Sequence, residues 1–271
     1  MNATSLLTRS SRPPLWREVR LGLEGASLLR DRVLRGEGLP DGRGRPALLI
    51  PGFLAGDTSL ALMSDWLRRA GYRPSRTGMR VNANCGGAAV EGLERRLERA
   101  VEEQGQRAVV IGQSRGGSFA KVLACRRPDL VSGVLTLGTP QVDPVAVHPL
   151  VRLHVEAVSR LGSLGAPGLF KRSCLAGDCC ASFWEELSGP LPSGVGFVSV
   201  YSRSDGIVDW RACLDPAADE LVEISSTHCG MAVNPAAWRA VAAALDRFGR
   251  AEARRRPASK PRPVRKLRRV A

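Results

Sequence analysis

A serine between two glycines is the first feature of the sequence that could carry chemistry. Residues 112–116 read GQSRG, which fits the pattern G-x-S-x-G around Ser114. The motif follows the apolar run AVVI at 108–111 and precedes a stretch with helical spacing. Small residues on both sides let the chain turn sharply from strand to helix and expose the hydroxyl. The pattern predicts Ser114 as an acyl-transfer nucleophile; the alternative is a glycine-rich turn with an incidental serine.

A serine hydroxyl needs a general base to become an effective nucleophile, and histidine is the usual one. The chain has three histidines. His148 and His154 lie in an irregular region near a helical stretch, where solvent-facing or structural roles are the better interpretation. His228 follows a predicted strand at 221–225 and precedes the last predicted helix. We therefore predict His228 as the base; the alternative is a structural loop histidine.

The base in turn needs an acid that fixes its tautomer and stabilises the imidazolium. Asp205 stands just beyond a predicted strand at 196–201, in a loop that leads toward His228. Asp209, four residues later, is the rival candidate, although it can also serve as a helix cap or an ion-pair partner. The position in the loop favours Asp205.

Acyl transfer also requires donors for the negative charge that develops on the carbonyl oxygen. The backbone N–H of Arg115, directly after the nucleophile, is the natural first donor. The second is expected from the loop after the strand that ends at Pro51, where Phe53 is the preferred donor and Leu54 a possible one. The alternative is that this loop only connects a strand to a helix.

The segments around these residues alternate between strand and helix. The expected strands are 46–51, 72–78, 107–112, 131–138, 196–201 and 221–225, and the expected helices are 60–70, 92–104, 117–126 and 235–248. Strands that alternate with helices of this length predict right-handed crossovers and a mostly parallel sheet with helices on both faces. This is an α/β fold class, and it places the loops that carry Ser114, Asp205 and His228 at one edge of the sheet.

Three segments fall outside this alternation. Residues 1–44 form an N-terminal segment with an amphipathic helix, whose apolar positions are Leu15, Val19, Leu23, Ala26, Leu29 and Val33. We expect this helix to pack on the core; the alternative is a helix on a membrane surface. An insertion at about 139–194 is longer than an ordinary loop and predicts a cap or lid within the domain 45–249. Residues 250–271 form a basic tail that we expect to be disordered.

The net charge of +14 is concentrated in that tail. Residues 250–271 hold ten Lys or Arg and one acid, a net of +9, which leaves +5 for the other 249 residues. The composition therefore does not indicate a nucleic-acid-binding fold. The tail is expected to be a solvated extension; the alternative is that it holds the protein near an anionic surface such as a membrane.

The seven cysteines show no paired C-x-x-C spacing, so no metal site is predicted. Cys85 and Cys125 are interpreted as small buried hydrophobes. Three cysteines at 174, 179 and 180 lie close together, and either free thiols or a loop disulfide fits them; Cys213 and Cys229 are left open in the same way. Neither a signal peptide nor a transmembrane run is visible, which makes the cytoplasm the expected location.

Four segments together resemble the α/β-hydrolase superfamily, in particular its bacterial lipase and esterase-like members. They are IPGF at 50–53, GQSRGG at 112–117, YSRSDGIV at 201–208 and STHCGM at 226–231. Their order, Ser114, Asp205, His228, is the order of that fold. Pro51 stands where many relatives have a histidine, and Arg115 where many have a smaller or uncharged residue.

The resemblance implies an α/β-hydrolase fold and hydrolysis of a carboxylic ester through an acyl-enzyme, without a metal or organic cofactor. The substrate would be a small-molecule or lipid ester with a hydrophobic acyl group. The same residues can also act on thioesters or transfer the acyl group to another acceptor. A silent module that binds a membrane or a protein partner is the alternative outside enzymes.

Overall fold

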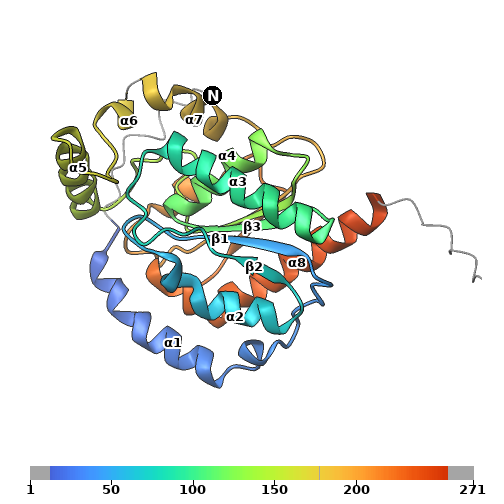
Figure 1. Ribbon diagram of the computed structural model, residues 1–271. Helices are drawn as coiled ribbons and strands as arrows, with labels where there is room; N and C mark the ends of the chain where they lie inside the picture. The colour runs from blue at the N-terminus through green and yellow to red at the C-terminus, as the bar shows by residue number, and fades with distance from the viewer. Residues whose placement is uncertain (1–12, 177, 256–271) are drawn as a thin grey trace, which may run out of the picture.

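Six parallel strands form the central sheet of the protein, whose computed structural model describes residues 13–176 and 178–255 (Figure 1). In hydrogen-bonded order they are β2 (Arg73–Ser75), β1 (Pro46–Ile50), β3 (Ala108–Gln113), β4 (Val131–Leu137), β5 (Gly196–Tyr201) and β6 (Glu220–Glu223). All neighbouring pairs are parallel, as predicted. The carboxyl ends of the strands therefore meet at one edge, where ligands bind in open α/β sheets.

Helices cover both faces of this sheet. α3 (Gly86–Gln104) and α4 (Arg115–Arg126) lie on one face, and α2 (Ala61–Arg69) and α8 (Pro235–Arg255) lie on the other (Figure 1). β1, β3 and β4 are buried along their whole length, because side chains on both of their faces meet a helix layer. Trp66 and Trp238 are fully buried on the α2–α8 side, with ring centroids 4.6 Å apart.

Three helices extend beyond their predicted ends. α3 begins at Gly86 and α4 begins directly after Ser114. α8 continues to Arg255, into the segment that we expected to be disordered. An ion pair between Glu252 and Arg107 and a hydrogen bond from Arg255 to the carbonyl of Gly194 hold these last turns on the domain. Residues 256–271 of the predicted tail lie outside the described residues.

The N-terminal segment is built differently from the single packed helix predicted for 15–34. It comprises the 3-10 helix η2 (Leu15–Arg20), α1 (Leu21–Arg30) and the 3-10 helix η3 (Arg32–Arg35). The expectation that its apolar stripe packs on the core is wrong at the centre of the stripe, where Val19, Leu23 and Leu29 are exposed. Glu24 and Leu28 are buried instead, and Val33, at the end of the stripe, is buried as expected. Leu28 and Val33 pack in the hydrophobic core, whereas Glu24 meets a backbone N–H group of a strand-end loop, described below.

The segment between β4 and β5 holds three further helices, α5 (Pro149–Ser163), α6 (Ser173–Ala176) and α7 (Ala181–Ser188), and the 3-10 turn η5 (Asp178–Cys180). Figure 1 shows α5 projecting from one side of the molecule and α6 and α7 lying above α3. The predicted role of this segment as a lid stays a prediction. No helix in the described part of the chain is both long and apolar enough to cross a bilayer.

Candidate active site

Ser114 occupies a sharp turn between β3 and α4. Its backbone φ is 51° and its ψ is −126°, a region that non-glycine residues rarely adopt. The turn is possible because glycines flank it: a β-carbon on Gly112 would lie 2.4 Å from the carbonyl oxygen of Gly116, and one on Gly116 would lie 2.2 Å from that of Ile50. The N–H of Ser114 donates to the carbonyl of Leu137 at 2.8 Å. These contacts hold the strained turn against the ends of β1 and β4.

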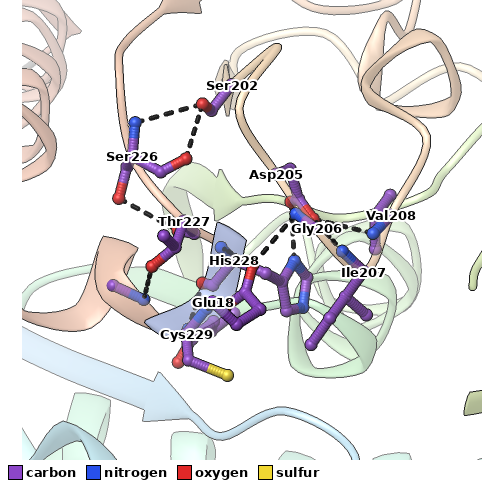
Figure 2. Close-up of polar contacts among 12 residues, drawn as sticks. Glu18, Ser202, Asp205, Gly206, Ile207, Val208, Ser226, Thr227, His228 and Cys229 are labelled. Carbon is purple, nitrogen blue, oxygen red and sulfur yellow. Dashed lines mark hydrogen bonds and ion pairs between the residues drawn. The ribbon is translucent and has the colours of Figure 1, made fainter. Parts of the chain in front are cut away.

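His228 and Asp205 form a buried pair on two neighbouring loops (Figure 2). The Nδ1 atom of His228 lies 2.7 Å from Oδ2 of Asp205. The other carboxylate oxygen, Oδ1, accepts the N–H groups of Ile207 at 2.8 Å and Val208 at 2.7 Å. The loop thus fixes the Asp205 carboxylate, which in turn orients the imidazole. Asp209 caps the 3-10 turn η6 (Trp210–Cys213) instead, as its alternative role anticipated.

The surroundings of His228 favour its protonated form. Burial lowers the pKa of His228, because an imidazolium loses hydration there. The charge of Asp205, its hydrogen bond and the charge of Glu18 outweigh this effect and raise the net pKa above its ordinary value of 6.5. The site therefore stabilises the imidazolium that forms when a base takes a proton.

Several close contacts bring the loops of Ser114, Asp205 and His228 together. Gln113, beside Ser114, donates from Nε2 to the carbonyl of His228 at 3.1 Å. A β-carbon on Gly138, at the end of β4, would lie 3.1 Å from Nδ1 of His228 and 3.2 Å from Oδ2 of Asp205. The loops that carry Ser114, Asp205 and His228 therefore lie together at the carboxyl ends of the strands.

The other two histidines lie elsewhere, on α5. His148 caps its N-terminus, where Nδ1 accepts the N–H of Leu150 at 3.2 Å, and His154 is exposed and pairs with the carbonyl of Leu150. Both are structural or solvent-facing, as expected.

The loop after β1 lies against the serine. A β-carbon on Gly52 would be 3.3 Å from Cβ of Ser114. Leu54 has a positive φ of 59°, and its N–H donates to the carbonyl of Asn82 at 3.1 Å, so this amide is occupied. The N–H of Phe53 has no acceptor within the described residues. Arg115 is the first residue of α4, and its N–H has no acceptor in the helix by geometry. Phe53 and Arg115 thus each have a backbone N–H without an acceptor in their own element, among the described residues.

The sequence did not indicate Asn82, whose side chain supports the loop after β1. Asn82 is buried; its Nδ2 donates to the carbonyl of Pro51 at 2.8 Å, and its Oδ1 accepts from the Arg115 guanidinium at 2.7 Å. The same guanidinium donates to the carbonyl of Asn84 at 2.6 Å and lies over the rings of Phe119 and Phe170. The large charged side chain of Arg115 therefore helps to hold the loop after β1. No pattern in the sequence marks Asn82.

Two acidic residues of the N-terminal segment support the His228 loop and were also missed. Glu18 accepts the N–H groups of Gly206 at 2.9 Å, His228 at 2.8 Å and Cys229 at 3.0 Å (Figure 2). Glu24 accepts the N–H of Thr227 at 2.8 Å and bonds the Ser226 hydroxyl and the Asn234 amide. The segment before the sheet thus ties the loops of Asp205 and His228 together.

Known families and curated proteins give no match to this sequence. Solved structures do. An α/β-superfamily hydrolase from Oenococcus oeni is 17% identical, with a TM-score of 0.51, and the match covers 78% of this chain and 93% of that one. A mature lipase from Bacillus licheniformis is 15% identical, with a TM-score of 0.55, and the match covers 76% of this chain and 94% of that one. A monoacylglycerol lipase from Paleococcus ferrophilus is 16% identical, with a TM-score of 0.53, and the match covers 78% of this chain and 96% of that one. Together with the parallel sheet and the turn at Ser114, these matches show that the chain has the α/β-hydrolase fold.

Proposed function

We propose that the protein is a serine hydrolase that cleaves carboxylic esters, with Ser114 as nucleophile, His228 as base and Asp205 as the residue that orients it. The observation that carries the proposal is the buried His228–Asp205 pair at the strand ends beside the strained turn of Ser114. The lipase and hydrolase names of the structural neighbours support it. A serine turn of this kind has its clearest use in acyl transfer.

The reaction runs through an acyl-enzyme. Nε2 of His228 takes the hydroxyl proton as Oγ of Ser114 attacks the ester carbonyl, and Asp205 stabilises the imidazolium. The N–H groups of Phe53 and Arg115 donate to the oxyanion of the tetrahedral intermediate. The imidazolium then protonates the leaving alcohol. Water, deprotonated by His228, attacks the acyl-enzyme and releases the acid. Every reacting group in these steps belongs to the chain, the ester or water.

An exposed apolar stripe supports a hydrophobic acyl group. α5 turns Leu150, Leu153 and Leu161 to solvent at helical spacing, its C-cap residue Leu164 continues the stripe, and each is about half exposed or more. Large apolar side chains gathered in this way mark interaction surfaces. Because α5 belongs to the segment that follows β4, it is connected to the edge of the sheet that carries the site. We propose that this segment is the lid and that its leucines contact the acyl chain.

Covalent labelling with a fluorophosphonate tests the proposed nucleophile. The wild-type chain is expected to react, and the variants Ser114→Ala and His228→Ala are expected not to. Labelling of a folded Ser114→Ala chain would place the reactive group elsewhere and remove the proposal. Esters of increasing acyl length, offered to the wild type, then test the proposed preference for a hydrophobic acyl group.

Replacement of Asn82 by alanine is expected to lower kcat for ester hydrolysis by about 10- to 100-fold with little change in KM. The variant removes the two side-chain bonds that hold Pro51 and Arg115, and a displacement of about 1 Å of the oxyanion donors costs rates of this order. Steady-state kinetics on a soluble ester measure the effect. A rise in KM with unchanged kcat would instead assign Asn82 to substrate binding.

Replacement of Glu18 by glutamine is expected to move the acid limb of the pH profile to lower pH. His228 acts as a base only when neutral, so activity falls as the pH drops through its pKa. The negative charge of Glu18 contributes to raising that pKa, and its removal lowers it. The amide also cannot accept all three backbone N–H groups, which lowers the Tm.

Glu24→Gln is the matched control for this variant. It removes a similar carboxylate that binds the same loop from the N-terminal segment, and Glu24 is not among the charges that shift the pKa of His228. The control is expected to lower the Tm and leave the acid limb of kcat/KM in place. Equal profiles for Glu18→Gln and the wild type would contradict an electrostatic role for Glu18.

We also propose peripheral contact with an anionic lipid surface. Trp16, Val19 and Leu23 are exposed on the N-terminal segment, and Figure 1 places α1 and α5 on the same side of the molecule. The basic C-terminal residues supply a second attraction, and stable membrane binding needs two. Vesicles of anionic lipid are expected to bind the full chain more tightly than a chain ending at Arg255, and less tightly at high salt. Equal binding would contradict the role of the tail.

A further inference from the structure

Four cysteine side chains meet outside the candidate active site. Cys85 directly precedes α3, and Cys174, Cys179 and Cys180 belong to α6 and η5. Their Sγ atoms all lie within 4.8 Å of one another. The Sγ–Sγ distance is 3.4 Å between Cys85 and Cys180, 3.5 Å between Cys174 and Cys179, and 3.8 Å between Cys179 and Cys180. All four are free thiols, and we refer to them as the cysteine cluster.

We propose that the cysteine cluster is a structural zinc site with four thiolate ligands. A tetrahedral zinc ion with Zn–S bonds of about 2.3 Å holds its sulfur atoms about 3.8 Å apart, which lies within the range of separations found, from 3.4 Å to at most 4.8 Å. A disulfide would need its two sulfur atoms at about 2.05 Å. Thiolates select zinc over hard cations such as magnesium and calcium. Four protein ligands leave no open coordination position, so the site is structural and not catalytic.

The groups around the cluster suit a negatively charged metal–thiolate centre. The backbone N–H of Lys171 donates to Sγ of Cys174 at 3.4 Å. The N–H groups of Gly87 and Ala88, at the N-terminus of α3, hydrogen-bond the sulfur atoms on their side of the cluster. The Arg115 guanidinium lies close enough to interact with the thiolate charges. Such donors and charges stabilise thiolate ligands and orient them.

The four sulfur atoms lie within 4.8 Å of one another, so four thiolates at these positions would repel one another strongly. A divalent cation bound between them offsets this repulsion, which couples metal binding to the fold of this region.

Zinc at this place joins two parts of the chain that are distant in sequence. Cys85 follows the loop of Asn82 and Asn84, which binds Arg115, and the other three ligands lie in the segment between β4 and β5. Phe183 of α7 already packs against the start of α3, where a β-carbon on Gly86 would lie 3.5 Å from its ring. The metal would fix α6 and α7 to this layer and is independent of the proposed ester chemistry.

Metal analysis of the purified full chain tests the site. About one zinc ion per chain is expected in the wild type, and a large loss is expected in Cys179→Ser, which changes an exposed ligand and so endangers folding least. Cys229→Ser is the matched control, because Cys229 is also exposed but lies outside the cluster; it should keep its zinc. Wild-type protein from cells grown with cobalt should show the charge-transfer and visible absorption bands of tetrahedral thiolate coordination. Cys229→Ser should keep these bands, and Cys179→Ser should lose them.

Thiol titration of the unfolded chain, with chelator and without reductant, separates zinc from disulfides. Seven reactive thiols are expected. Three thiols would show two disulfides in the cluster and overturn the proposal, as would wild-type protein that binds neither zinc nor cobalt. A chelator that removes the metal should also lower the Tm of the wild type and leave that of Cys179→Ser unchanged.

Discussion

Replacement of Ser114 by alanine is expected to lower kcat for ester hydrolysis by about 10⁴-fold or more while the fold is kept. A serine hydrolase without its nucleophile retains only the rate enhancement that comes from oxyanion stabilisation and substrate binding. The turn at Ser114 is strained, with φ at 51°, and the strain lies in the backbone. Alanine keeps that backbone, so the unfolding free energy should change by less than about 1 kcal/mol.

The control for this variant is Ser182→Ala, which removes an exposed hydroxyl from α7. Its kcat and its labelling by a fluorophosphonate should equal those of the wild type. A Ser114→Ala chain that keeps more than about 1% of the wild-type kcat, with its Tm unchanged, would exclude Ser114 as the nucleophile.

Much of the candidate site follows from local patterns in the sequence. The G-x-S-x-G motif between an apolar strand and a helix is a local signal, and Ser114 lies in the predicted turn. Asp205 and His228 were placed by a topological argument, since loops after parallel strands meet at one edge of the sheet. The structure brings them to 2.7 Å, and the cap formed by Asp209 explains why it is not the partner.

What the sequence could not reveal depends on how distant segments dock. Periodicity shows that the N-terminal segment has an apolar face and a polar one, but not which face packs. Here Glu18 and Glu24 turn inward because the strand-end loops offer unpaired backbone N–H groups, whose burial without acceptors would be costly. The cysteine cluster escaped the C-x-x-C criterion for a similar reason, because Cys85 and the other three residues approach one another only in the fold.

Replacement of Asp205 by asparagine is expected to lower kcat by about 10⁴-fold at neutral pH. The amide oxygen can keep the bonds from Ile207 and Val208, but its NH₂ group then faces Nδ1 of His228. The imidazole must accept there, so Nε2 carries the proton and cannot take one from Ser114. Loss of the carboxylate also lowers the pKa of His228, whose elevation depends mainly on Asp205 among the charged groups.

Asp209→Asn is the control for the tautomer argument, because Asp209 lies on the same loop and caps η6 through its side-chain oxygen, a bond that the amide can keep. Its kcat should stay within a few-fold of the wild type. The NMR signal of the His228 ring should show the proton on Nδ1 in the wild type and on Nε2 in Asp205→Asn.

If Asp209→Asn lost the activity and Asp205→Asn kept it, the two carboxylates would exchange roles, and the 2.7 Å contact between Asp205 and His228 would be structural. If the proton stayed on Nδ1 in both variants and only Asp205→Asn lost kcat, Asp205 would act through its negative charge and not by fixing the tautomer of His228.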